Sequence, residues 1–239
     1  MNTVVTLMVL STGLLSFFGQ VRENEVVAAT PDAHRLRTGQ FTYKDSSAGK
    51  ELGTSKIKIE KGLDSGNYQF SMQSSGYLDQ RWEAIAGPSF EPVSAKIRFG
   101  EAPPYFDLTY ASGKVTGFVT SRSTTGSKRS VDAAISPGTV DQRIDWAAVL
   151  SNDLQPGQRF EFSVYDPGIG TSHVLAVVSP LEQVHVPAGS FPVFRVIYRI
   201  EKATGTEQYV VFATESLPRM MVREDFPDGT TSELVEMSK

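Results

Sequence analysis

Several short stretches of this chain place apolar residues at every second position, and this alternation limits its fold more than any other feature. A period of two is typical of strands that bury one face and expose the other. The alternating apolar positions are Ile57 and Ile59; Tyr68, Phe70 and Met72; Ile97 and Phe99; and Phe106, Leu108 and Tyr110. We therefore expect half-exposed antiparallel strands over much of the chain.

Short polar segments that contain glycine separate these runs, as in residues 64–67 and 227–230, and they favour turns. The last third of the chain carries the longest apolar runs, which indicate central strands at residues 174–178, 184–186, 191–200, 209–212 and 220–222. Alternating strand–helix units and fixed-period repeats are both missing from the sequence. The predicted fold class is mainly β: a single strongly curved antiparallel sheet, or a partly open β-barrel, with one short helix.

The helix is expected at residues 140–150. Thr139 and Gln142 have the spacing of a capping box, and apolar residues follow at helical intervals. Trp146 lies on this helix, where a tryptophan more often fills a core than contacts a ligand.

The amino-terminal residues 4–18 carry no charge and would span about 22 Å as a helix, which is short for a membrane span. We expect residues 1–29 to be an export signal, with cleavage after Val27-Ala28-Ala29. An uncleaved amino-terminal anchor or a buried core helix is the alternative, because no Lys or Arg precedes the apolar segment. Residues 30–239 are expected to form a single β-rich domain that is exported, periplasmic or secreted.

The chain contains no Cys, which excludes disulfides, thiolate metal sites, cysteine nucleophiles and the lipid-modified cysteine of a lipoprotein. Its three histidines, His34, His173 and His185, form no metal-binding pattern. No Gly-x-Ser-x-Gly elbow is present. Carboxylates are plentiful, but the sequence selects no pair for acid–base catalysis among residues such as Asp79, Glu83, Asp107, Glu161 and Asp225. We predict no catalytic residue, no metal and no cofactor.

The formal net charge is -4, which gives no field to attract nucleic acid. Residues 194–200 interleave aromatic and arginine side chains, but a half-buried strand needs that pattern anyway. The polar residues 121–130 are expected to form an exposed, mobile hairpin tip with solvated charges. Nucleic acid is therefore not an expected partner.

Curved antiparallel strands can close over a packed core or enclose a cavity for an apolar ligand, and periodicity does not distinguish the two. The candidate ligand-binding residues are the large alternating side chains, although each also suits an ordinary core: Tyr68, Phe70, Met72, Phe106, Leu108 and Tyr110.

From about Gly39 to the end, the chain resembles an uncharacterised family of exported bacterial β-rich proteins, the domain-of-unknown-function family thirty-one-oh-eight. The residues that carry the resemblance are Leu154-x-Pro156-Gly157-Gln158-x-Phe160, then Val184-x-Val186-Pro187-Ala188-Gly189-x-Phe191, and finally Pro218-Arg219-Met220 with Asp228-Gly229 and Glu233-Leu234. The resemblance implies a periplasmic or surface location and a curved sheet broadly like lipoprotein-carrier half-barrels or lipocalins. It supplies no catalytic residue.

Three functions follow as hypotheses. The first is an exported, non-enzymatic cell-envelope protein that binds a lipid or other apolar small molecule in its curved sheet. The second is a structural or protein-interaction module with an envelope protein as its partner. The third is an enzyme that acts on envelope polymers, which two carboxylates of raised pKa converging in a cleft would favour.

Overall fold

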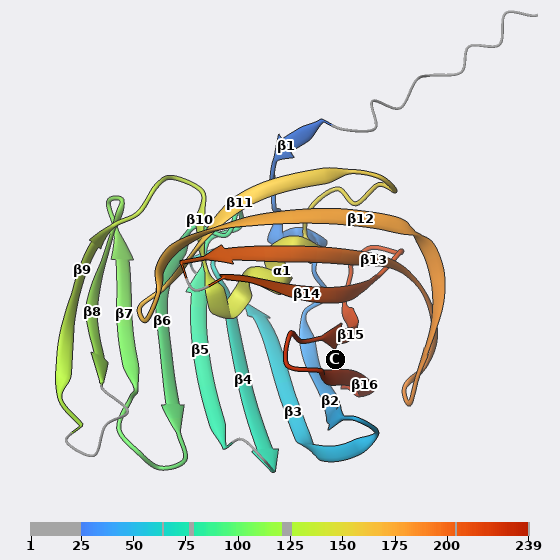
Figure 1. Ribbon diagram of the computed structural model, residues 1–239, viewed down its shortest axis with the longest axis horizontal. Helices are drawn as coiled ribbons and strands as arrows, with labels where there is room; N and C mark the ends of the chain where they lie inside the picture. The colour runs from blue at the N-terminus through green and yellow to red at the C-terminus, as the bar shows by residue number, and fades with distance from the viewer. Residues whose placement is uncertain (1–24, 64, 77–78, 121–125, 204, 239) are drawn as a thin grey trace, which may run out of the picture.

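One large sheet dominates the computed structural model, which describes residues 25–63, 65–76, 79–120, 126–203 and 205–238 (Figure 1). The strands follow the order β1-β11-β12-β13-β14-β15-β16-β2-β3-β4-β5-β6-β7-β8-β9, and β10 pairs with β11 beside this path. Within the described residues the two ends of this path do not pair, so the sheet is strongly curved but not closed into a barrel. The predicted fold class is confirmed.

The sheet has two arms. The amino-terminal arm contains β2 (Gly39–Ser47), β3 (Lys50–Lys61), β4 (Tyr68–Gly76), β5 (Gln80–Ala86), β6 (Pro92–Phe99), β7 (Phe106–Ala111), β8 (Lys114–Thr120) and β9 (Lys128–Ala134). The carboxy-terminal arm contains β11 (Arg159–Asp166), β12 (Gly170–Val186), β13 (Gly189–Lys202), β14 (Gly205–Thr214), β15 (Met221–Asp225) and β16 (Thr230–Ser238). Antiparallel pairing of β16 with β2 joins the arms, and β12–β14 run across the direction of β3–β7 (Figure 1).

Two short strands depart from the antiparallel pattern that the sequence predicts. Both β1 (Val26–Ala28) and β10 (Thr139–Asp141) pair in parallel with β11. The predicted cleavage point after Ala29 follows β1 directly. The apolar residues 4–18 lie outside the described residues.

The strand β12 unites two runs that the sequence separates, residues 174–178 and 184–186. Its register with β13 shifts between Val178 and Leu181, next to Pro180, which has no N–H to donate to the ladder. The strand bends in this stretch (Figure 1). Its hairpin with β13 reaches back to β16, where the Ala188 N–H donates to the carbonyl of Leu234 at 3.0 Å.

The helix begins later than the sequence predicts. Residues up to Asp141 are extended because β10 pairs with β11, and a 3-10 turn, η2 (Gln142–Ile144), precedes α1 (Asp145–Leu150). Thr139 is not the cap, since its hydroxyl is buried without a hydrogen-bond partner among the described residues. Asp141 caps the 3-10 turn instead, because its Oδ1 accepts from the Arg143 N–H at 2.9 Å.

Arg219 satisfies the other end of α1. Its Nη1 donates to the carbonyls of Leu150, at 3.2 Å, and Asn152, at 2.7 Å. These carbonyls have no partner inside the helix, so a buried cation suits them. This contact explains structurally why the segment Pro218-Arg219-Met220 carries an arginine.

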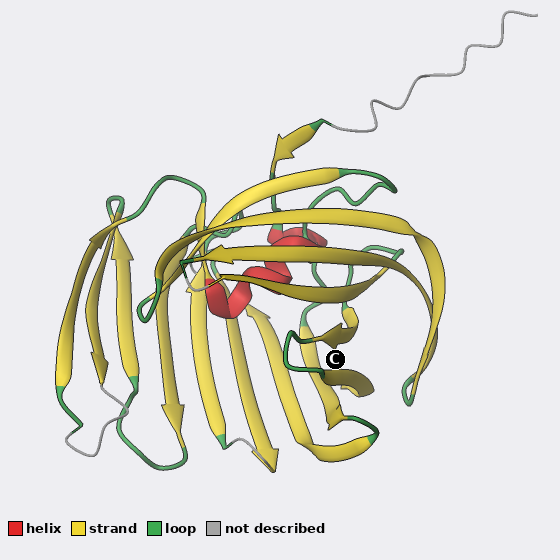
Figure 2. Cartoon of the chain, viewed as in Figure 1, coloured by secondary structure: helices red, strands yellow, loops and turns green. Residues whose placement is uncertain are grey.

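The helical segment lies between the two arms, where η2 contacts β5 and α1 contacts β14 (Figure 2). A second 3-10 turn, η1 (Ala33–Arg35), precedes β2 and contacts α1. One continuous apolar core joins the inner faces of the arms to α1. None of the helices in the described part of the chain is long and apolar enough to cross a membrane.

Candidate functional site

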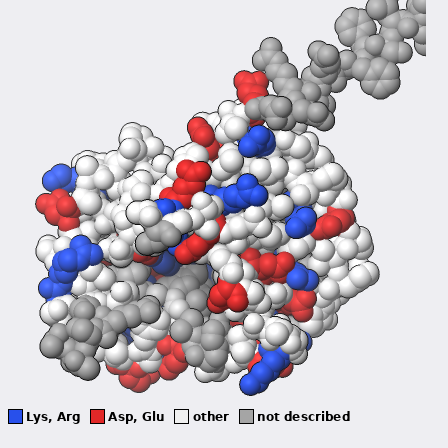
Figure 3. Space-filling view, viewed as in Figure 1, with Lys and Arg blue, Asp and Glu red and all other residues white. Residues whose placement is uncertain are grey.

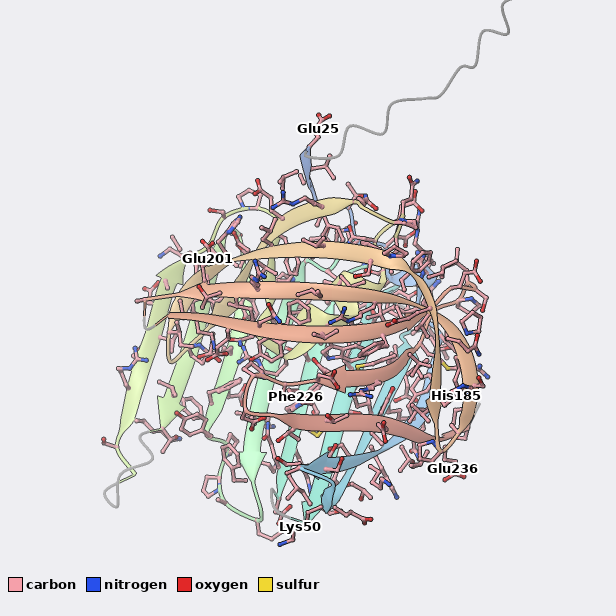
Figure 4. The ribbon with its side chains drawn as sticks, turned by 45° about the vertical axis from the view of Figure 1, so that its right-hand side comes forward. Glu25, Lys50, His185, Glu201, Phe226 and Glu236 are labelled. Atoms are coloured by element: carbon pink, nitrogen blue, oxygen red, sulfur yellow. The ribbon has the colours of Figure 1, made fainter. Side chains whose placement is uncertain are left out.

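A cavity of about 490 Å³ lies between the two arms, next to the helical segment. Its walls come from β2–β5 on one side, from β13–β16 on the other, and from η2 and α1. Six aromatic residues line it: Tyr43, Trp82, Trp146, Tyr198, Tyr209 and Phe226. Four aliphatic or thioether side chains also line it, Ile57, Met72, Ile169 and Met221, and the other thirteen lining residues are polar or charged. In Figure 4, Phe226 lies at the turn between β15 and β16, whereas Glu236 lies near the far end of β16.

A buried ion-pair cluster around Arg143 forms one side of the cavity. The Nε atom of Arg143 lies 2.5 Å from Oδ1 of Asp141, and its Nη1 lies 2.6 Å from Oδ2 of Asp166. Tyr110 adds a hydrogen bond of 2.5 Å to Oδ2 of Asp141, and the guanidinium stacks over the Phe106 ring. Burial alone lowers the pKa of Arg143, but the two carboxylates raise it above its ordinary value. Arg143 therefore stays charged, and it is paired with the carboxylates of Asp141 and Asp166.

A second ion pair, between Lys202 and Glu207, sits near the cavity wall. Lys202 Nζ lies 2.5 Å from Glu207 Oε2, which also accepts from the Tyr209 hydroxyl at 2.9 Å. Burial raises the pKa of Glu207, but these two hydrogen bonds outweigh it and lower the pKa overall. The Tyr209 ring stacks on Tyr198, with ring centroids 5.1 Å apart.

Three further buried carboxyl groups line the cavity without an ion-pair partner among the described residues: Asp45, Asp145 and Glu224. Asp45 accepts hydrogen bonds from the hydroxyls of Ser55, at 2.6 Å, and Ser232. Asp145 accepts one from the backbone N–H of Trp146 at 2.6 Å. Glu224 accepts one from the Tyr198 hydroxyl at 3.2 Å.

Burial raises the pKa of both Asp145 and Glu224. The pKa of Asp145 rises to about 7, even though its hydrogen bond from Trp146 and the nearby charge of Arg143 lower it. The pKa of Glu224 rises to about 8, because burial and the neighbouring Asp145 both disfavour its charged form. Glu224 is therefore mostly protonated at neutral pH, and Asp145 is partly so.

The histidines lie outside the cavity lining. His34 contacts Asp32 at 2.9 Å and His173 contacts Glu161 at 3.2 Å, both on exposed surface. Across the residues with described positions, no group of three His, Asp or Glu side chains could hold a metal ion. On the face drawn in Figure 3, acidic and basic side chains are interspersed and form no continuous basic surface.

The six candidate ligand-binding residues divide into two sets. Met72 lines the cavity. Tyr68, Phe70, Phe106, Leu108 and Tyr110 are buried in the core and do not belong to the cavity lining. Trp146 combines both expected roles, since it is 6% exposed, donates its indole N–H to the Arg143 carbonyl at 3.2 Å and faces the cavity.

Sequence reasoning missed the three cavity carboxyl groups. Asp45 had a usable signal, because it continues the inward alternation of Phe41 and Tyr43 on β2. Asp145 had no comparable signal, since it lies in a run of consecutive buried residues where periodicity does not assign a face. Glu224 follows the buried residues Met221 and Val222 and lies between the half-buried Arg223 and Asp225, so the short strand β15 shows no regular alternation that would single it out.

Comparisons with known proteins identify one matching family and one solved structure with a similar fold. The family described as "Protein of unknown function (DUF3108)" matches residues 40–235. Among curated proteins no relative of the chain is found. A β-barrel-like protein of the domain of unknown function DUF1849 from Brucella abortus is similar in structure, with a TM-score of 0.58 and 11% sequence identity, over 85% of this chain and 98% of that one. This likeness supports the fold.

Two other solved structures are more distant. A protein assigned as exported, with a YmcC-like fold, from Bacteroides fragilis has a TM-score of 0.36 and 12% identity, over 87% of this chain and 100% of its own. A protein assigned as a lipoprotein from Parabacteroides distasonis has a TM-score of 0.34 and 12% identity, over 90% of this chain and 100% of its own. Both scores are too low to establish a shared fold.

Proposed function

This chain belongs to the family of proteins of unknown function DUF3108, and from that premise we propose that it is an exported, non-enzymatic protein of the bacterial cell envelope that binds a lipid or other apolar small molecule between the arms of its sheet. The observation that carries the proposal is the cavity of about 490 Å³. Pockets of a few hundred cubic ångströms suit small-molecule ligands, and the aromatic and apolar side chains of this one offer a surface for an apolar group. A filled interior would have favoured a structural module instead.

The wall explains why an amphipathic ligand fits better than a purely apolar one. One part is formed by large apolar side chains such as Trp82, Met72 and Met221, while another presents the carboxyl groups of Asp145 and Glu224. Burial of a ligand's apolar part contributes about 25 cal/mol per Å². The polar groups orient the ligand.

Native mass spectrometry of the protein purified from its own cell envelope, followed by lipid extraction, tests this proposal. We expect an adduct of a few hundred daltons, as suits a pocket of this class, that is lost on denaturation. The variant Met72→Trp, which fills the cavity, should lose the adduct. Leu181→Trp is the matched control, because Leu181 is 43% exposed on the surface, and it should keep the adduct. A bare mass with a stable protein partner would contradict the proposal and favour an interaction module.

One observation favours a second candidate, an enzyme that acts on envelope polymers. Asp145 and Glu224 are two carboxyl groups of raised pKa in one cavity. Acid–base catalysis usually needs environments that push two pKa values apart, whereas here both are raised. Incubation with purified cell-wall polymer tests this candidate: release of soluble fragments that is lost in both Asp145→Asn and Glu224→Gln would support it.

A further inference from the structure

The charges that line the cavity do not balance. Five carboxyl groups line it: Asp45, Asp145, Asp166, Glu224 and Asp228. Its two basic residues already have partners, since Arg143 pairs with Asp141 and Asp166, and Lys202 pairs with Glu207. Within the part of the chain that is described, four of the five therefore have no ion pair with Lys or Arg: Asp228, which is exposed, and the buried Asp45, Asp145 and Glu224.

Two of these three groups also have few hydrogen bonds. Serine hydroxyls occupy both carboxylate oxygens of Asp45. By contrast, Asp145 accepts through Oδ1 from its neighbour's backbone, and Glu224 accepts through Oε1 from Tyr198, each through one oxygen. Both residues are 5% exposed and line the cavity. Each therefore keeps one carboxylate oxygen available to a ligand in the cavity.

The aromatic wall supplies a second and independent observation. Trp82, Trp146 and Tyr43 lie in the same cavity lining as the two carboxyl groups. Aromatic faces carry partial negative charge and attract cations, most strongly where water is excluded. Carboxylates beside aromatic faces are the combination that recognises an ammonium group, whereas an anionic headgroup would be repelled.

We propose that the cavity binds an amphipathic cation, whose ammonium group contacts the carboxylates of Asp145 and Glu224 and whose apolar chain lies against Met72 and Met221. This inference rests on the proposed function, because it names the chemical class of the ligand in the same cavity. The ammonium group replaces the basic side chain that these two carboxylates lack.

The proposal makes binding dependent on pH, because an ammonium group favours the ionised carboxylates. The groups that act on Asp145 and Glu224 come from every neighbouring element: Arg143, Asp141, Lys202, Tyr198, Tyr43, Tyr209, Asp225 and Asp45. Arg143 and Lys202 favour the ionised form of Asp145, while the acidic neighbours disfavour ionisation of both groups. Burial raises both pKa values, to about 7 for Asp145 and about 8 for Glu224. Binding of a cation should therefore strengthen as pH rises from 6 to 9.

Isothermal titration calorimetry of the full chain with decyltrimethylammonium tests the proposal, with decanol as the neutral probe of the same chain length. The cation cannot lose a proton, so any pH dependence belongs to the protein. At pH 9 we expect the cation to bind on the order of tenfold more tightly than decanol. Its affinity should fall on the order of tenfold at pH 6, while that of decanol stays constant.

Two variants assign the effect to the named carboxyl groups. Glu224→Gln and Asp145→Asn keep the side-chain shape, and each should reduce the preference for the cation and flatten its pH dependence. The control is Glu236→Gln, because Glu236 is an exposed glutamate on the next strand. It should leave both affinities unchanged.

The outcomes separate this inference from the proposed function. If decanol binds as tightly as the cation at every pH, the cationic ligand is excluded while the binding function stands. If neither probe binds, both proposals fail. If the cation binds preferentially but equally well in all three variants, its site is not at Asp145 and Glu224.

Discussion

Two groups of buried charged residues line the same cavity, and they are built on opposite principles. Around Arg143, every charge has a partner of opposite sign within 2.6 Å. At Asp145 and Glu224, two carboxyl groups share a buried space, and Asp145 raises the cost of ionising Glu224. Breaking a balanced cluster leaves buried charges without partners, whereas an unbalanced cluster already carries a cost that a ligand can offset.

Replacement of Arg143, the cation at the centre of the balanced cluster, should lower the stability of the protein the most. In Arg143→Met, Asp141 and Asp166 lose their shared partner of opposite charge, so we expect the free energy of unfolding to fall by about 3 to 5 kcal/mol. Urea denaturation at neutral pH measures it. Lys114→Met is the control, because Lys114 and its partner Asp132 are 60% and 67% exposed, and its effect should stay below about 1 kcal/mol. Equal losses of stability in Arg143→Met and Lys114→Met would contradict the special importance of the buried cluster.

Loss of one hydroxyl should affect the two groups differently. Tyr110→Phe removes the hydrogen bond to Asp141, which is buried and paired with Arg143, and should cost about 2 kcal/mol. Tyr198→Phe removes the longer hydrogen bond to Glu224, which is mostly protonated, and should cost less than about 1 kcal/mol. Denaturation of both variants under the same conditions gives the comparison, and a larger loss for Tyr198→Phe would reverse our assignment.

A pH series tests the raised pKa of Glu224 directly. The pKa of Glu224 is raised from 4.5 to about 8 in the folded protein, so the folded state holds a proton that the unfolded state has already lost between these values. Its contribution to stability is complete below pH 4.5 and is lost as pH rises toward 8.

Glu224→Gln removes this titration. The variant should match the parent protein near pH 4 and should be the more stable of the two at pH 8.5, where the folded parent must ionise a buried carboxyl group. Thermal denaturation across this pH range measures the difference. Glu236→Gln is again the control. If Glu224→Gln is less stable than the parent protein at pH 8.5, the pKa of Glu224 is not raised in the folded protein.

Local periodicity predicted the fold well but could not assemble the site. Alternation between neighbours decides which face of a strand is buried, so the curved sheet follows from residues such as Tyr68 and Phe70. The cavity depends on residues 45, 145 and 224, which meet only through the pairing of β16 with β2 and the position of α1. No short-range pattern contains that information. The late start of α1 has the same origin, because the pairing of β10 with β11 overrides the capping signal at Thr139.

The strand order also has a consequence for how the chain folds. Within each arm, strands that are neighbours in the sequence are neighbours in the sheet, and β16–β2 is the seam between the arms. Asp45 and Ser232, which hydrogen-bond across that seam, are 187 residues apart. Contacts between such distant residues slow folding, whereas hairpins form quickly. Each arm can therefore form hairpin by hairpin, while the cavity wall between Asp45 and Glu224 is completed when the seam closes. A circular permutant that links the end of β16 to residue 25 and opens the chain between β9 and β10 would bring β16 and β2 much closer in sequence, and should reach the same sheet faster.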